Sequence, residues 1–203
     1  MLKIAIIGAS TIGSLYGAAF HEAGNSVEFY VREESVEKYP PLLTYKIIDE
    51  RKCIKNCYQY DRLIFTNANK LDDFDLILVS TRHYQIKRVL QLLSDTKKPN
   101  ILIFCNVWSK LSDLYNSISP ERLFFGMPRG GGTIHQPSNV LEGGLFKEVI
   151  LGKSTNPFYK KILHLFQYSK FKVTEIDDMQ SWYWTHLATT IAWITGSAKA
   201  QGF

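Results

Sequence analysis

The sequence contains few of the features that mark secreted, membrane-spanning or disordered proteins. Its 203 residues include only three cysteines, Cys53, Cys57 and Cys105, and their spacing is not that of a zinc site. They predict reduced, structural thiols and no bound metal. No apolar run approaches the roughly 18 residues that a membrane-spanning helix needs. Apolar residues make up 45% of the chain and charged residues 21%, which excludes a disordered protein.

Concentrated positive charge is also missing. The formal net charge is +5, but lysine and arginine are scattered along the chain, whereas a nucleic-acid-binding protein usually has one basic face. We therefore expect neither a nucleic-acid nor a membrane partner, and the modest positive balance suits a protein that binds anionic cofactors and substrates. Residues 1–3 lead directly into an apolar segment, so no signal peptide is expected and a cytoplasmic location follows.

The start of the chain carries the clearest structural pattern. Residues 2–7 (LKIAII) form a short apolar run, which predicts a strand buried on both faces. A glycine-bearing turn occupies residues 8–13, helical periodicity covers residues 14–23, and residues 27–31 (VEFYV) predict a second strand. Such a strand–helix–strand unit has the length that a parallel crossover requires. The expected fold class is α/β: a Rossmann-type doubly wound parallel sheet, followed by the start of an all-α C-terminal domain.

Further segments extend this sheet and end in a helical region. Strands are predicted at residues 75–80, 101–105, 122–125 and 171–174, and around Thr133 and Val149. Helices are predicted at residues 84–93, 109–115, 157–169 and 178–202, and the mixed segment 33–70 predicts a short helix and edge strands. The domain boundary falls either near residue 155 or just before Asp178. The second, preferred position gives a dinucleotide-binding domain over residues 1–176 and the beginning of a helical substrate or dimerisation domain over residues 177–203.

Each glycine of a dinucleotide-binding turn has a mechanical role. The first makes the tight turn, the second lets the backbone approach the diphosphate, and the third lets helix and strand pack closely. Gly8 and Gly13 occupy the first and third places, and Ser10 stands at the second. The Ser10 side chain either weakens binding by its bulk or donates its hydroxyl to a phosphate oxygen. The residues predicted to bind the cofactor here are Gly8, Ala9, Ser10, Thr11, Ile12 and Gly13.

The residue that follows the second strand distinguishes NADP from NAD. An acidic residue there binds the ribose 2′-hydroxyl, whereas an arginine accommodates a 2′-phosphate. Arg32 stands at this position, and its planar guanidinium suits a phosphate group. The sequence therefore favours NADP (NADPH) over NAD. Glu33 and Glu34 follow directly and weaken this inference, and a solvated surface charge is the alternative interpretation of Arg32.

Five segments, in their order and spacing, resemble the ketopantoate reductases (2-dehydropantoate 2-reductases) over essentially the whole chain. These segments are KIAIIGASTIGSLYGAAFHEAGNSVEFYVR, DLILVSTRHYQ, ILIFCN, FFGMPRGGGTIHQPSNVLEGG and FKVTEIDDMQSWYWTHLATT. The resemblance implies an NADPH-dependent reductase of a 2-keto acid. It implies that Arg82, in place of a family lysine, joins Arg32 at the 2′-phosphate. It also implies that Asn106 lies near both the nicotinamide and the substrate.

The chain departs from that family in its last predicted helix. The family pattern W-x-K-L-x-x-N supplies a general-acid lysine and a substrate-placing asparagine, and His186 and Thr190 stand at these places. Residues four apart share a helix face, so one ketone oxygen can meet both side chains. A histidine with a pKa near neutrality can donate the proton, although a packed helix histidine without chemistry is the alternative. Because Ile194 replaces a second asparagine and the sequence ends at Phe203, we interpret the chain as a divergent, apparently truncated member.

Two hypotheses about function follow. The first is an NADP-dependent oxidoreductase that acts on the CH–OH group, with hydride transfer to a small 2-keto acid or related carbonyl substrate. The second is a catalytically inactive nucleotide-binding or interaction protein that keeps the Rossmann fold. Large aromatic side chains in the last helix also predict a homodimer through that helix. These side chains are Trp182, Tyr183, Trp184 and Trp193.

Overall fold

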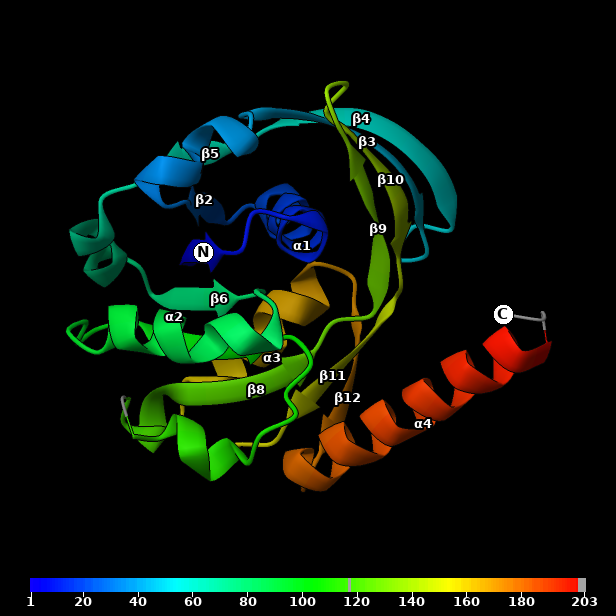
Figure 1. Ribbon diagram of the computed structural model, residues 1–203. Helices are drawn as coiled ribbons and strands as arrows, with labels where there is room; N and C mark the ends of the chain where they lie inside the picture. Colours follow the sequence, from blue (N-terminus) through cyan, green and yellow to red (C-terminus); the bar gives the residue numbers. More distant parts are fainter. Residues whose placement is uncertain (117, 201–203) are drawn as a thin grey trace.

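The main sheet is the centre of the computed structural model, which describes residues 1–116 and 118–200. Its eight strands lie in the order β12-β11-β8-β7-β6-β1-β2-β5, and only the β8–β11 pair is antiparallel (Figure 1). The bounds are β1 Lys3–Ile7, β2 Ser26–Tyr30, β5 Leu63–Phe65, β6 Leu76–Val79, β7 Asn100–Phe104, β8 Leu123–Met127, β11 Glu148–Gly152 and β12 Lys172–Ile176. The expected α/β class and doubly wound sheet are confirmed.

Helices cover both faces of this sheet. Side chains of β1 alternate between two buried clusters: Ile4 and Ile6 belong to the cluster that includes helices α1 and α3, and Ala5 and Ile7 to the cluster that includes α2 and the start of α4. Burial on both faces is why β1 is continuously apolar. The helices are α1 Thr11–Glu22, α2 Ile86–Leu93, α3 Tyr159–Tyr168 and α4 Met179–Ala200. Short 3₁₀ turns lie at Glu33–Lys38, Ala68–Asp73, His83–Gln85, Leu111–Leu114 and Pro120–Arg122.

A second, four-stranded sheet curves around α1 on the side away from the main sheet (Figure 1). Its strand order is β4-β3-β10-β9, with bounds β3 Leu42–Asp49, β4 Ile54–Asp61, β9 Gly130–His135 and β10 Val140–Leu145. Leu43, Tyr45 and Leu141 of this sheet are fully buried in the α1 cluster. α1 is thus held between two sheets, which fixes the turn that precedes it.

The mixed segment 33–70 forms the expected short helix, a 3₁₀ helix at Glu33–Lys38, and the expected edge strands, since β4 and β5 each lie at an edge of a sheet. Two other sequence predictions of local structure are wrong. A helix over residues 109–115 is reduced to a 3₁₀ turn at Leu111–Leu114. α1 begins at Thr11 and not at residue 14, because Ser10 already occupies the N-cap position. The first turn of α1 therefore belongs to the glycine turn itself.

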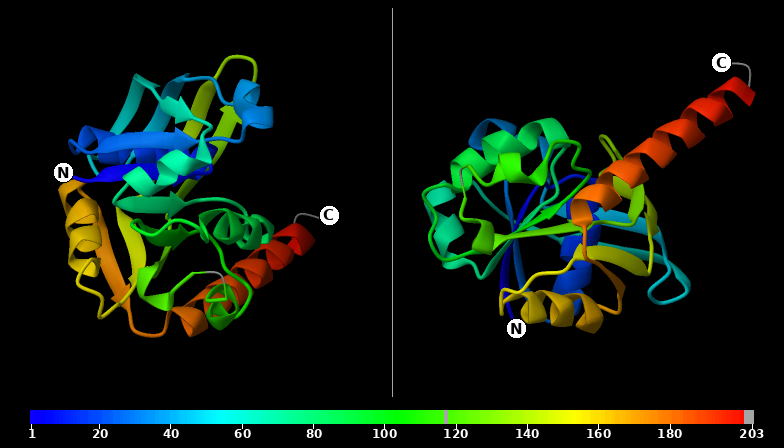
Figure 2. Two further views of the ribbon diagram at one scale, coloured as in Figure 1. Left: turned by 90° about the vertical axis from the view of Figure 1, so that its left-hand side faces the viewer. Right: turned by 90° about the horizontal axis from the view of Figure 1, so that it is seen from below.

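Helix α4 follows β12 and extends away from the body of the molecule (Figure 2). Its first turns are packed, since Tyr183 is fully buried, whereas Trp184, Ile191 and Trp193 further along are exposed. The proposed boundary after residue 176 falls between β12 and α4, but a separate domain and a homodimer through α4 stay predictions. Residues 201–203 of the predicted helical region lie outside the described residues. Within the described part of the chain, no helix combines the length and apolar character needed to cross a membrane.

One hydrogen bond joins α4 to the main sheet. The Tyr183 hydroxyl, fully buried, donates to the carbonyl oxygen of Gly126 in β8 at 2.8 Å. We expect Tyr183→Phe to lower the free energy of unfolding by about 1 kcal/mol, because a buried hydrogen bond contributes roughly that amount. Urea unfolding of this variant beside Tyr168→Phe, whose parent side chain is 79% exposed, provides the measurement. Equal stability of both variants and the wild type would contradict the anchoring role.

Candidate functional site

A cleft of about 1200 Å³ opens at the carboxyl ends of β1 and β6. From β1 the chain builds the sheet first toward β2 and then, through β6, in the opposite direction. Such a change of direction is where open α/β sheets bind their ligands. The turn after β1 supplies Gly8, Ala9, Ser10 and Ile12 to the cleft lining.

Close packing within the glycine turn explains why glycine occupies its two ends. Gly8 has φ +112°, a left-handed backbone conformation that favours glycine. A Cβ atom on Gly13 would lie 1.9 Å from the carbonyl oxygen of Gly8 and 2.8 Å from Oγ of Ser80. The Ser80 hydroxyl, at the end of β6, donates to the Gly8 oxygen at 3.0 Å. Gly13 therefore packs beneath the cleft rather than lining it, as the third glycine of the motif is expected to do.

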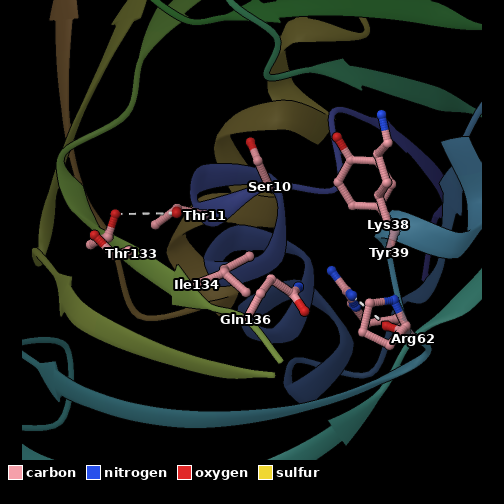
Figure 3. A pocket seen from close by; sticks show the side chains of 10 residues that line it. Ser10, Thr11, Lys38, Tyr39, Arg62, Thr133, Ile134 and Gln136 are labelled. Carbon is pink, nitrogen blue, oxygen red and sulfur yellow. Dashed lines mark hydrogen bonds between the residues drawn. The ribbon is translucent and has the colours of Figure 1, made fainter. Parts of the chain in front are cut away.

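The N-terminus of α1 faces this turn. Ser10 is the N-cap residue, is exposed, and makes no side-chain capping hydrogen bond. The Thr11 hydroxyl donates to the carbonyl oxygen of Gly132 at 3.2 Å, so it ties α1 to β9 (Figure 3). The first turn of α1 contains no acidic residue. Its backbone N–H groups and positive dipole end suit a bound anion.

Arginines gather where the cleft passes the end of β2. Arg32 lines the cleft, and its guanidinium forms an ion pair with Glu34 at 2.9 Å. Arg82 and Arg88, before and within α2, line the same cleft. Burial, and then the charge of Glu34, raise the pKa of Tyr30, while Arg32 and Arg88 oppose the rise. These charges share one region, and a phosphate group there would compete with Glu34 for Arg32.

Asn106 is exposed and lines the cleft, as do Met127 and Pro128. Its place near the nicotinamide and the substrate stays a prediction. Its neighbour Cys105 is buried, and burial raises the pKa of its thiol to about 12, so it is not a thiolate near neutral pH. Thr81 also lines the cleft, and its hydroxyl is buried without a hydrogen-bond partner in the described structure. An unpartnered buried hydroxyl is a position at which a ligand group is expected.

The structure places His186 and Thr190 on α4, and neither is among the residues that line the cleft. The His186 ring stacks on Trp182 with centroids 4.9 Å apart, and the Thr190 hydroxyl donates to the His186 backbone carbonyl at 2.7 Å. Burial, and then the positive charge of Arg129, lower the pKa of His186. Arg129 lies in sequence between Pro128 and Gly130, which do line the cleft. The catalytic role of His186 and Thr190 stays a prediction.

The cleft lining includes residues that the sequence did not predict, among them Ser80, Thr81 and Arg88. Ser80 follows the apolar strand at residues 75–80, and the carboxyl end of a buried strand was a usable signal for it. Arg88 is four residues after Tyr84 in the predicted helix, so both could have been placed on one face. The dinucleotide turn, Arg32, Arg82 and Asn106 are brought to one cleft, whereas His186 and Thr190 are not.

The chemistry of this cleft fits a dinucleotide. Its volume exceeds the range of about 300–1000 Å³ that is typical of small-molecule sites. It combines a glycine turn at a helix N-terminus, three arginines and a buried threonine hydroxyl without a hydrogen-bond partner in the described structure. A dinucleotide carries matching groups: a central diphosphate, and two nucleosides at its ends.

Comparison with known proteins agrees with this geometry. The 2-dehydropantoate 2-reductase of Listeria monocytogenes is 30% identical over 105 residues, which are 51% of this chain and 34% of that protein. A 2-dehydropantoate 2-reductase from Geobacter metallireducens superimposes with a TM-score of 0.76 at 21% identity, over 94% of this chain and 63% of that one.

A D-mandelate dehydrogenase in a ternary complex with NADH and anilino(oxo)acetate gives a TM-score of 0.68 at 21% identity, over 86% of this chain and 57% of that one. The chain therefore spans about a third of the curated relative and less than two thirds of these solved structures. The family model for "Ketopantoate reductase PanE/ApbA" matches residues 4–156 of the 203. Because this match covers well over half of the sequence, the chain belongs to the ketopantoate reductase PanE/ApbA family.

Proposed function

We propose that the cleft binds NADPH and that the protein reduces the carbonyl group of a small 2-oxo acid. The observation that carries the proposal is the glycine turn, in which Gly13 packs against Gly8 at a distance that no Cβ atom would permit. Residues 8–13 hold the diphosphate in this proposal, and Arg32 and Arg82 hold the 2′-phosphate. Arg88 adds a third positive charge to the cleft lining.

The proposed reaction divides between the cofactor and the chain. Bound nicotinamide would supply the hydride. The chain must position the carbonyl group and donate a proton to its oxygen atom. Asn106 lines the cleft and has an amide group suited to positioning, and His186 is the proposed proton donor on α4. The 2-oxo acid is proposed because the relatives are named for a 2-oxo acid and a 2-hydroxy acid.

Cofactor preference tests the proposal through Arg32. We expect Arg32→Ala to weaken NADPH binding about tenfold and leave NADH binding within twofold, because a charge-assisted hydrogen bond contributes roughly 1.5–3 kcal/mol. Dissociation constants measured by nicotinamide fluorescence provide the comparison. Lys87→Ala removes a positive charge from α2 without changing the described cleft lining and serves as the control.

A second variant tests the competition between Glu34 and the phosphate. Glu34→Gln removes the carboxylate that pairs with Arg32, so NADPH should bind a few-fold more tightly. Equal affinities of the wild type for NADPH and NADH, unchanged by either substitution, would show that the cleft does not recognise the 2′-phosphate. That result would leave the fold and the cleft intact but end the 2′-phosphate argument.

A further inference from the structure

Arg62 is a buried cation that the proposed reaction does not use. It directly follows β4, and its backbone N–H donates to the carbonyl oxygen of Pro41. Only 2% of the residue is exposed, which is rare for a side chain with a permanent charge. Burial lowers the pKa of its guanidinium. A charge in such a place normally requires a partner of opposite sign.

The hydrogen-bond acceptors around Arg62 are all neutral. One terminal nitrogen donates to the carbonyl oxygen of Ala9 and to Oγ of Ser14, each at 2.9 Å. The other terminal nitrogen and Nε donate to the carbonyl oxygens of Pro40 and Pro41. No carboxylate of the described residues forms an ion pair with Arg62. Each of its three nitrogen atoms has an acceptor, but no carboxylate neutralises its charge.

Arg51 is a second buried arginine of this protein, and acidic side chains neutralise its charge. Its side chain is also 2% exposed, but it pairs with Asp49 at 2.7 Å and with Glu22 at 3.3 Å. The protein therefore buries one arginine with acidic partners and another without them. The difference points to an anion outside the chain as the partner of Arg62.

Arg62 does not line the large cleft but lies beside the glycine turn that does. Arg62 borders a cavity of about 300 Å³ together with Ser10 and Thr11, the first residues of the α1 N-terminus (Figure 3). Two of its hydrogen-bond acceptors belong to Ala9 and Ser14. In the sequence these residues lie before and after the first residues of α1. Arg62 thus joins the loop between β4 and β5 to the segment on which a diphosphate is expected.

We propose that Arg62 is a positioning residue for the diphosphate of the cofactor. Its guanidinium donates a hydrogen bond to the Ala9 carbonyl oxygen. The partial negative charge of that oxygen is therefore offset when an anion enters the cleft. Arg62 also adds one buried positive charge behind the turn, where low polarity strengthens its attraction for an anion. This inference rests on the proposed function, because it assumes that the turn binds a diphosphate.

Three ligands separate this role from that of Arg32: NADPH, NADH and inorganic pyrophosphate. We expect Arg62→Gln to weaken all three about tenfold and to leave the ratio of NADPH to NADH affinity unchanged, since the diphosphate is common to them. Arg32→Ala should change that ratio and leave pyrophosphate binding within twofold. Arg62→Lys keeps the charge and should remain within about threefold of the wild type.

The same titrations distinguish a merely structural role. If Arg62→Gln and Arg62→Lys are both folded by circular dichroism at the titration temperature and bind the three ligands as the wild type does, Arg62 only supports the fold and the proposal is overturned. Binding of pyrophosphate that depends on Arg62, without binding of NADPH, would keep this inference and reject the proposed cofactor. Failure of the wild type to bind any of the three would reject both.

Discussion

Gly13→Ala is expected to weaken NADPH binding at least 100-fold. The added Cβ would lie 1.9 Å from the Gly8 carbonyl oxygen and 2.8 Å from Ser80 Oγ, so the turn and α1 must separate. Forced overpacking of this kind typically costs about 1–3 kcal/mol of stability as well. The segment that separates is the one on which the diphosphate is expected, and the loss of affinity should therefore exceed the loss of stability.

Gly131→Ala is the matched control for that experiment. A Cβ atom at Gly131 would have no neighbour within 4 Å, and its backbone lies outside the left-handed region. Thermal melts of both variants with and without NADPH separate stability from binding, because a ligand that binds only the folded state raises the melting temperature. A Gly13→Ala protein that NADPH stabilises as strongly as it stabilises Gly131→Ala would show that the cofactor binds elsewhere.

His186→Ala is expected to lower kcat/KM for reduction of a 2-oxo acid by about 100-fold or more, the usual range for loss of a general acid. Burial and the positive charge of Arg129 hold the pKa of His186 below its ordinary value of 6.5. The protonated imidazole is the donor, so it predominates only below that lowered pKa. Reduction should therefore be fastest at mildly acid pH and fall as the pH rises through the pKa, while oxidation of the 2-hydroxy acid should rise.

The pH profile is the decisive control for His186. In His186→Ala this decline between acid and neutral pH should disappear, whereas His164→Ala, which changes an exposed histidine on α3, should keep the wild-type profile and rate. An unchanged profile in His186→Ala would exclude His186 as the donor. NADPH binding without turnover of any small 2-oxo acid would favour a catalytically inactive nucleotide-binding protein.

The first unit of the fold could be predicted because its signals are local. An apolar strand, a glycine turn and a periodic helix follow one another within residues 2–23, and each has its own sequence pattern. Only the helix start was misplaced by three residues, since Ser10 caps the helix from within the glycine turn. Gly8, Ala9, Ser10, Ile12 and Arg32 line the cleft, and their binding of a cofactor stays a prediction.

The second sheet could not be predicted because its pairing is not local. β3 pairs with β10, so that Thr44 lies beside Val140. The residue pattern of neither segment predicts that the two strands are partners. Two glycines of this sheet allow its strands to approach closely. A Cβ atom on Gly143 would lie 2.1 Å from the Gly131 carbonyl oxygen, and one on Gly132 would lie 2.2 Å from the Glu142 carbonyl oxygen. Contact between β9 and β10 therefore requires glycine at these two positions.

Arg62 shows the same limit for the site. A single arginine after a strand has no signature in the sequence, and its acceptors come from Ala9, Ser14 and the Pro40–Pro41 loop. Ser80 was recognisable as the end of a strand, but its contact with Gly8 depends on β1 and β6 being neighbours. Predicting these roles needs the strand order as well as the sequence.

Calorimetric titration of the unmodified protein with NADPH and with NADH tests the central proposal most directly. The account predicts one site per chain, tighter binding of NADPH, and an NADPH affinity that falls with added salt, because arginines and a helix N-terminus hold the phosphates. The absence of binding heat and of any thermal stabilisation with either nucleotide would contradict it. That result would mean that the cleft keeps the shape of a dinucleotide site without its function.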